Sequence, residues 1–233
     1  MSKKNYYIIE KNTHKIRNNI PTNFLNPKTI KQVLSKLKEY DTKIYRTYYE
    51  SERNIVYVKE KPKVSLIEII SFKKLTHREI MGSVYNLNID EEMFGDIVIT
   101  NNHYYVYVIK KYLPFLIHNF KNIGRYSIKI KEVSLDILKD YKRCYERIEI
   151  IVSSIRIDSV VSKIIHKNRN FIKEFFVQRN IYVNYESCLK PSYTLKEGDI
   201  FSIRGYGKYK FGDIMKSTKK GGYIIECFKY TEN

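Results

Sequence analysis

The chain has 233 residues, of which 43% are hydrophobic and 29% are charged, and this balance predicts packed domains rather than a disordered chain. With 43 Lys and Arg against 25 Asp and Glu, the net charge is +18, which favours an anionic partner, nucleic acid ahead of an anionic membrane surface. The three cysteines, Cys144, Cys188 and Cys227, are widely spaced, which argues against a disulfide framework or a zinc site and fits a reducing compartment.

Residues 1–63 are expected to form a small α/β region. The first residues, "MSKKNYYIIEKN", lack the apolar core of a signal peptide, and no run of the sequence approaches the ~18 apolar residues of a membrane span. We therefore expect a cytoplasmic protein without a membrane partner. Apolar residues at helical spacing predict a helix over 26–40, with Asn26 as its N-cap. Two alternating runs around "ESERN" predict a hairpin over 43–60.

Residues 64–150 are expected to form a second domain with the element order β-α-β-β-α-β, which is that of the ferredoxin-like (RRM-like) fold. Strands are predicted over 64–72 and 125–133, and a short helix ends near Gly124. Thr76 and Glu79 have the spacing of a helical capping box. Asn101 and Asn102 separate two apolar runs and predict a tight hairpin.

Residues 151–233 are expected to form a third domain, in which two helices precede a small β-sheet. The chain as a whole is thus predicted to be α+β. The apolar residues of the two helices recur at helical spacing and predict one buried face on each. They are Ile157, Val160, Val161, Ile164 and Ile165 in the first helix, and Phe171, Ile172, Phe175 and Phe176 in the second.

Cations cluster on the polar faces of these two helices and on the strand end that follows. Arg169 begins the second helix after Asn168, a good N-cap, and the backbone N–H groups at a helix start bind phosphate well. Arginine also offers a planar fork of donors that lysine lacks. The residues predicted to bind a polyanion are Arg156, Lys163, Lys167, Arg169, Lys173, Arg204, Lys208, Lys219 and Lys220. Alternatively, each of these cations only faces solvent.

Two further groups are candidate contacts with weaker support. Tyr206 and Tyr209 are interleaved with cations and are candidates for stacking on unpaired bases, although each is equally expected as a packing residue. His77 and Arg78 lie in the first turn of the predicted middle-domain helix. They are candidates for an RNA or partner contact, and the alternative is a purely structural role.

The sequence resembles a known family in two separate stretches. "RIDSVVSKIIHKNRNFIKEFFVQRNIYVN" followed by "PSYTLKEGDIFSIRGYGKY" resembles the S-four-type RNA-binding domain, named after a ribosomal protein. "LTHREIMGSVYNLNIDEEMFGDIVI" (75–99) is similar to the middle domain of the YlmH-like family of bacterial RNA-binding proteins. The resemblance covers residues 20–230, and the joint presence of both stretches makes it more specific than either alone.

The resemblance implies binding to ribosomal RNA or tRNA on the large ribosomal subunit, in the rescue and quality control of stalled subunits. One departure concerns the turn after the second helix, where the family usually has glycine and this chain has Arg179. If that turn requires a positive φ, either Arg179 is strained or Asn180 adopts the conformation instead. The N-terminal region is also short for the family.

Catalysis is not expected from the motifs present. "SIRID" superficially resembles the catalytic stretch of pseudouridine synthases, but Asp158 lies within the helix pair and is expected to be a first-turn acid favoured by the helix dipole. "RGYGKYKFG" lacks the spacing of a nucleotide-binding loop. No paired-carboxylate or cysteine–histidine motif is present, so we expect neither a cofactor nor a metal.

The leading hypothesis is a monomeric, non-enzymatic protein that binds structured RNA through its phosphates and 2′-hydroxyls. Two other classes stay open. One is an RNA-modifying enzyme, or its accessory subunit, with an active site within 64–150. The other is a basic adaptor linked to cell division that binds a membrane surface.

Overall fold

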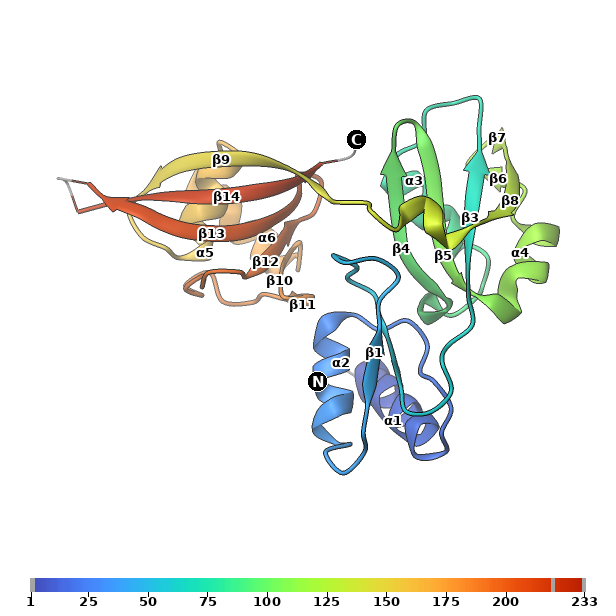
Figure 1. Cartoon of the computed structure of the whole chain (residues 1–233). Helices are drawn as coiled ribbons and strands as arrows, with labels where there is room; N and C mark the ends of the chain where they lie inside the picture. Colours follow the sequence, from blue (N-terminus) through green and yellow to red (C-terminus); the bar gives the residue numbers. More distant parts are fainter. Residues whose placement is uncertain (1–2, 219–220, 232–233) are drawn as a thin grey trace. The chain divides into compact units, whose positions relative to one another are not determined.

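The computed structural model describes residues 3–218 and 221–231 and has a mixed α/β fold with several sheets (Figure 1). The chain divides into two units, the first ending at Lys142 and the second starting at Arg143. The predicted division at residue 63 does not separate two units. The division predicted at residue 150 lies earlier, because strand β9 (Cys144–Val152) pairs with β14 (Tyr223–Thr231) inside the second unit.

The N-terminal part of the first unit contains two helices and one hairpin. Helix α2 (Pro27–Ser35) begins after Asn26, whose side chain accepts the N–H of Thr29, as predicted. Strands β1 (Lys43–Tyr45) and β2 (Ile55–Tyr57) pair antiparallel, which confirms the predicted hairpin. The sequence does not predict helix α1 (Lys3–Arg17), because the side that it buries includes polar residues such as Asn12.

The larger sheet of the first unit has the strand order β4-β5-β3-β8, and every neighbouring pair is antiparallel. The predicted capping box forms at Thr76 and Glu79. Asn101 and Asn102 both have positive φ values, 50° and 60°, as a tight hairpin turn requires. Along the chain the elements are β3 (Val64–Ile70), α3 (His77–Tyr85), β4 (Phe94–Thr100), β5 (His103–Ile109), α4 (Leu113–Asn119) and β8 (Lys129–Val133).

Short elements complete the first unit. They are the 3₁₀ turns η1 (Glu91–Met93), η2 (Lys110–Tyr112) and η3 (Leu135–Leu138), and the two-residue strands β6 (Asn122–Ile123) and β7 (Tyr126–Ser127). Strands β6 and β7 pair antiparallel and carry the chain from α4 towards β8.

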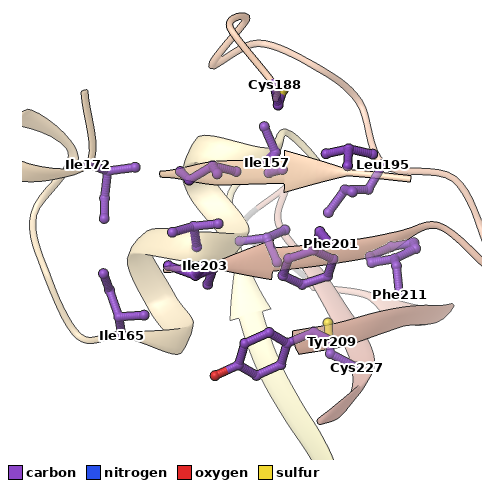
Figure 2. Close-up of a cluster of buried hydrophobic side chains, with 14 of the residues drawn as sticks. Ile157, Ile165, Ile172, Cys188, Leu195, Phe201, Ile203, Tyr209, Phe211 and Cys227 are labelled. Atoms are coloured by element: carbon purple, nitrogen blue, oxygen red, sulfur yellow. The ribbon is translucent and has the colours of Figure 1, made fainter. Parts of the chain in front are cut away.

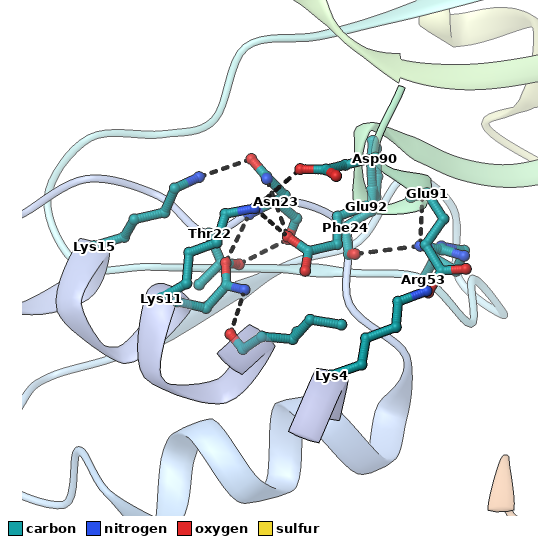
Figure 3. Close-up of polar contacts among 12 residues, drawn as sticks. Lys4, Lys11, Lys15, Thr22, Asn23, Phe24, Arg53, Asp90, Glu91 and Glu92 are labelled. Atoms are coloured by element: carbon teal, nitrogen blue, oxygen red, sulfur yellow. Dashed lines mark hydrogen bonds and ion pairs between the residues drawn. The ribbon is translucent and has the colours of Figure 1, made fainter. Parts of the chain in front are cut away.

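A buried carboxylate joins α1 to the segment before β4 (Figure 3). Glu92 is 4% exposed, accepts a hydrogen bond from the side chain of Asn23 at 3.2 Å, and lies 3.4 Å from the ammonium of Lys11. Lys15 donates to the same Asn23 at 2.8 Å, and its pKa is lowered to about 8, chiefly by burial. Since a buried charge is costly without partners, this network holds α1 in one position against the middle of the unit.

We expect Glu92→Gln to lower the stability of the first unit by about 1–3 kcal/mol, because the half-buried lysines lose their compensating charge. The measurement is amide hydrogen exchange in peptides from residues 3–17 and 94–109. Glu91→Gln is the matched control, since the Glu91 side chain is 40% exposed and its ion pair with Lys4 is long, at 3.6 Å. Equal protection in both variants would show that the buried carboxylate is not what holds α1.

The second unit has a six-stranded sheet with the order β11-β10-β12-β13-β14-β9, antiparallel throughout. Its remaining elements are α5 (Ile157–Ile164), α6 (Arg169–Val177), β10 (Ile181–Val183), β11 (Glu186–Ser187), β12 (Ile200–Ile203) and β13 (Gly207–Ser217). The sequence does not predict β13, because glycines at 205, 207 and 212 interrupt its alternating pattern.

One face of this sheet packs against α5 and α6 (Figure 2). Val160 and Ile172 contribute the predicted apolar faces of the two helices, and both are fully buried. The sheet contributes alternate residues such as Phe201, Phe211 and Cys227. Burial raises the pKa of the Cys227 thiol to about 12, so it is a packing residue rather than a reactive group.

Helix α6 ends in a motif that normally contains glycine. The N–H of Arg179 donates to Phe176 at 3.1 Å, and the N–H of Asn180 donates to Phe175 at 2.8 Å, which is the hydrogen-bond pattern of a Schellman cap. Arg179 has a φ of 55°, in the left-handed region, and Asn180 does not share it. The backbone strain of this turn is therefore at Arg179, and Asn180 does not adopt the left-handed conformation in its place.

Arg179→Gly is expected to raise the stability of the second unit by about 1 kcal/mol, because glycine adopts this conformation without steric cost. Chemical denaturation followed by circular dichroism measures the change. Lys173→Gly, within α6, is the opposite control and should lower stability by about 1 kcal/mol. A loss of stability in Arg179→Gly would mean that the arginine side chain more than offsets its backbone strain.

Candidate nucleic-acid interface

The N-terminal ends of helices α5 and α6 differ in whether their backbone N–H groups are available to a ligand. The first N–H groups of α5 are occupied by the chain itself, since Ile157 donates to Tyr193 at 2.8 Å and Asp158 donates to Pro191 at 3.2 Å. At the start of α6, the side chain of Asn168 accepts the N–H of Phe171 and confirms the predicted N-cap. The start of α6 is therefore the better placed of the two for an anion.

A hollow of about 600 Å³ lies beside the start of α6. The guanidinium of Arg169 donates from one nitrogen to the hydroxyl of Ser153 at 2.9 Å and to that of Ser159 at 3.3 Å. These bonds hold the guanidinium at the wall of the hollow. The other lining residues are Ile151, Val152, Ser162, Lys163, Thr218, Gly221 and Gly222. Two cations and several hydroxyls on one concave surface are suited to a phosphate group.

The sequence alone does not identify most of the hydroxyl groups that line this hollow. Ser153 follows strand β9, Ser162 lies on α5, and Thr218 follows β13, so three separated segments supply them. A short polar residue in any one segment carries no signal by itself. Only the packing of α5 against the sheet brings them together.

Arg156 and Asp158 form an ion pair rather than two independent functional groups. The Arg156 guanidinium donates two hydrogen bonds to the Asp158 carboxylate, at 3.1 and 2.9 Å. Asp158 is 8% exposed and also accepts the N–H of Ser159 at 2.9 Å. The carboxylate is thus satisfied within the first turn of α5, and it compensates the charge of Arg156 before any ligand arrives.

We expect Asp158→Asn to destabilise the second unit by about 1–2 kcal/mol, since the two charge-assisted bonds to Arg156 weaken. RNA affinity should stay the same or rise, because one negative charge is removed. Thermal denaturation and fluorescence anisotropy measure the two effects. Glu197→Gln, at an exposed position, makes the same change in charge and should alter stability by less than about 0.5 kcal/mol.

The solvent side of α5, α6 and the loop between them, called the helix surface below, carries Lys163, Lys167, Arg169 and Lys173, all of them exposed. Lys163 and Arg169 both line the hollow. The ammonium of Lys167 lies 5.7 Å from the ring centroid of Phe171, and Lys173 follows Arg169 one turn along α6. The structure thus brings these four predicted cations onto one pair of helices.

Arg204 and Lys208 do not join this group. Arg204 is exposed in the turn after β12, and its N–H donates to Asn180 at 2.9 Å, so it lies at the far end of α6, about 14 Å of helix from Arg169. Lys208 lies on β13 beside Tyr209, which faces the helices, and it therefore points to the opposite face of the sheet. Lys219 and Lys220 lie outside the described residues.

The expectation that Tyr209 stacks on RNA is wrong. Tyr209 is 3% exposed, stacks on Phe201 at 5.3 Å, and donates its hydroxyl hydrogen to the carbonyl of Tyr206. Its ring is part of the core and cannot reach a base. Tyr206 is 37% exposed, with its ring 5.9 Å from that of Phe175, so it stays a candidate.

The two middle-domain candidates lie at the start of α3 and are both exposed. Arg78 lines a hollow of about 300 Å³ together with residues of α3 and the β6–β7 turn. Tyr126, on the other side of this hollow, has the ammonium of Lys73 at 4.6 Å from its ring centroid. His77 makes contacts of its own and does not line the hollow.

The described residues contain neither a candidate membrane-spanning helix nor a candidate metal-binding cluster. None of the helices within 3–218 and 221–231 is long and apolar enough to cross a membrane. In the same part of the chain, no group of three or more His, Cys, Asp or Glu side chains could hold a metal ion.

Comparison with known proteins gives three similarities. Residues 59–137 match the family described as "Putative RNA-binding domain in YlmH". The ribosome-associated protein quality control protein P2 of Bacillus subtilis (strain 168) is 26% identical over 154 residues, which are 66% of this chain and 60% of that relative. The solved cell division protein ylmH from Streptococcus pneumoniae is 24% identical, covers 60% of this chain and 97% of its own, and has a TM-score of 0.47.

Proposed function

We propose that this YlmH-like protein is non-enzymatic and binds structured RNA through the second unit, while the family match over residues 59–137 lies in the first unit. The observation that carries the proposal is the hollow at the start of α6, where Arg169 and Lys163 meet several hydroxyls. A phosphate there accepts hydrogen bonds from the guanidinium fork and meets the positive end of α6. These groups contact the RNA backbone, so binding depends on RNA shape more than on base sequence.

The finer fold assignments are part of this proposal. We propose a ferredoxin-like middle domain, supported by the strand order β4-β5-β3-β8, and an S-four-type second unit, supported by the α5–α6 pair on its sheet. The family match over 59–137 suggests a further RNA or ribosomal-protein contact in the middle domain. His77 and Arg78, exposed at the start of α3, are the proposed residues for it.

The proposed setting is the ribosome. The relative from Bacillus subtilis is named for ribosome-associated protein quality control, and this chain spans 60% of its length. We propose that the present protein binds ribosomal RNA or tRNA on the large subunit, as a cytoplasmic monomer. A net charge of +18 supports long-range attraction to the polyanionic subunit.

Arg169→Ala is expected to weaken binding to a short RNA hairpin, and to large ribosomal subunits, by about 1–3 kcal/mol. The slope of log affinity against log salt concentration should also become shallower by about one, as expected for the loss of one phosphate contact. Fluorescence anisotropy over a series of salt concentrations measures both effects. Arg169→Lys keeps the charge but lacks the guanidinium fork, so its RNA affinity should lie between those of the wild-type protein and Arg169→Ala.

Lys196→Ala is the charge-matched control, because this exposed lysine lies in the loop before β12 and does not line the hollow. It should change affinity only slightly. If Arg169→Ala binds the hairpin and the subunits as tightly as Lys196→Ala does, the hollow is not the RNA site.

A further inference from the structure

The sheet of the second unit has a second face, opposite the one that packs on α5 and α6. Along each strand, residues that enter the core alternate with residues that do not, as in any pleated strand. Tyr209 and Phe211 of β13 are in the core, so Lys208 and Lys210 point the other way. The same alternation places further residues on this second face, called the outer face below; its aromatic residues are Tyr145, Tyr182, Phe228 and Tyr230.

The strand register brings the aromatic residues of the outer face together. Tyr145 of β9 pairs with Tyr230 of β14, and their rings meet edge to face with centroids 5.1 Å apart. The ring of Phe228 lies 6.5 Å from that of Tyr145. Tyr145 on β9 is 37% exposed and Tyr182 on β10 is 39% exposed, so accessible rings lie towards both edges of the outer face. Four strand spacings, about 19 Å, separate β10 from β9.

Cations surround these rings. The ammonium of Lys208 lies 4.9 Å from the ring centroid of Tyr230, and the guanidinium of Arg143 lies 5.5 Å from the same ring. Lys210 is opposite Phe228 in the pairing of β13 with β14. The result is a surface of aromatic rings and positive charges on neighbouring strands.

The outer face also carries two acidic residues, Glu149 and Glu226, which lie further along the strands from the rings. Arg147 binds Glu226 at 2.8 Å and Glu149 at 3.0 Å, and these two acids pair with each other across β14 and β9, further along the strands from Tyr145. Glu146 alternates to the other side of β9 and lies 3.9 Å from Lys229. The aromatic half of the outer face therefore keeps a net positive charge.

We propose that the outer face binds an unpaired, single-stranded segment of RNA. Bases stack on Tyr145 and Tyr182, while Lys208, Lys210 and Arg143 bind the phosphates between them. The lysines favour this occupant over a protein partner, since lysine is depleted from protein–protein interfaces whereas a polyanion needs it.

This inference rests on the proposed RNA-binding function and adds a second site to it. The helix surface and the outer face lie on opposite sides of one sheet. An RNA that contains a stem next to an unpaired strand could occupy both sites at once. Binding at one site then raises the effective concentration of the RNA at the other.

The chain contains no tryptophan, so a single substitution creates a unique fluorescent reporter. Tyr145→Trp places an indole on the outer face, and stacking of a base is expected to quench its emission when a single-stranded oligouridylate is added. Tyr49→Trp is the control, because Tyr49 is 88% exposed and lies in the first unit. Quenching of the first reporter alone supports the proposal, and quenching of neither or of both overturns it.

Affinity measurements separate this site from the helix surface. Tyr145→Leu and Tyr182→Leu, which keep apolar bulk without a ring, should each weaken oligouridylate binding by roughly 5- to 150-fold. Both should leave binding of an RNA hairpin within about twofold. Arg169→Ala should show the reverse pattern. Circular dichroism of each variant checks that the sheet is intact.

The possible results distinguish the two proposals. If hairpin binding needs Arg169 but oligouridylate binding is unchanged in both leucine variants, the outer-face site is wrong and the proposed function stands. If the wild-type protein binds neither RNA, both are wrong. If the emission of the Tyr145→Trp variant changes when RNA-free ribosomal proteins are added but not when oligouridylate is added, the outer face binds a protein partner. That result overturns the proposal.

Discussion

The antiparallel register of β13, β14 and β9 is the constraint on which the second unit depends. Because side chains alternate across a strand, this register decides which residues meet α5 and α6 and which meet solvent. It buries Tyr209, Phe211 and Cys227 beneath the helices. A slip of one residue would put lysines into the core and expel the aromatic rings. Both proposed RNA surfaces follow from this choice, one on the helices and one on the outer face.

The first unit depends on a different kind of interaction. Glu92 is a carboxylate inside the protein; Asn23 and Lys11 contact it, and Lys15 donates to the side chain of Asn23. Such a network contributes less to net stability than an apolar core of the same size, but it tolerates few other arrangements. It is one of the contacts that join α1 to the rest of the first unit, within which a domain boundary at residue 63 was expected.

Local signals predicted the elements that are stabilised locally. The caps at Asn26, Thr76 and Asn168 each mark a helix start, and Asn101-Asn102 marks a tight turn. Prediction failed where stability comes from distant partners. The predicted boundary at residue 150 cuts through strand β9, because its partner, β14, lies about 80 residues later in the chain. Helix α1 was missed because its buried side includes Asn12 and Thr13.

The charge, the two amphipathic helices and the position of Arg169 at a helix start follow from the amino-acid sequence, because each depends on composition or on residues within a few turns of one another. Which cations act together depends on the packing of distant segments. Lys163 and Arg169 share a hollow with serines from separate segments, whereas Lys208, close to Arg204 in sequence, faces the other side of the sheet. The physical reason is that a strand alternates its side chains between two faces, and only packing against the helices decides which face is buried.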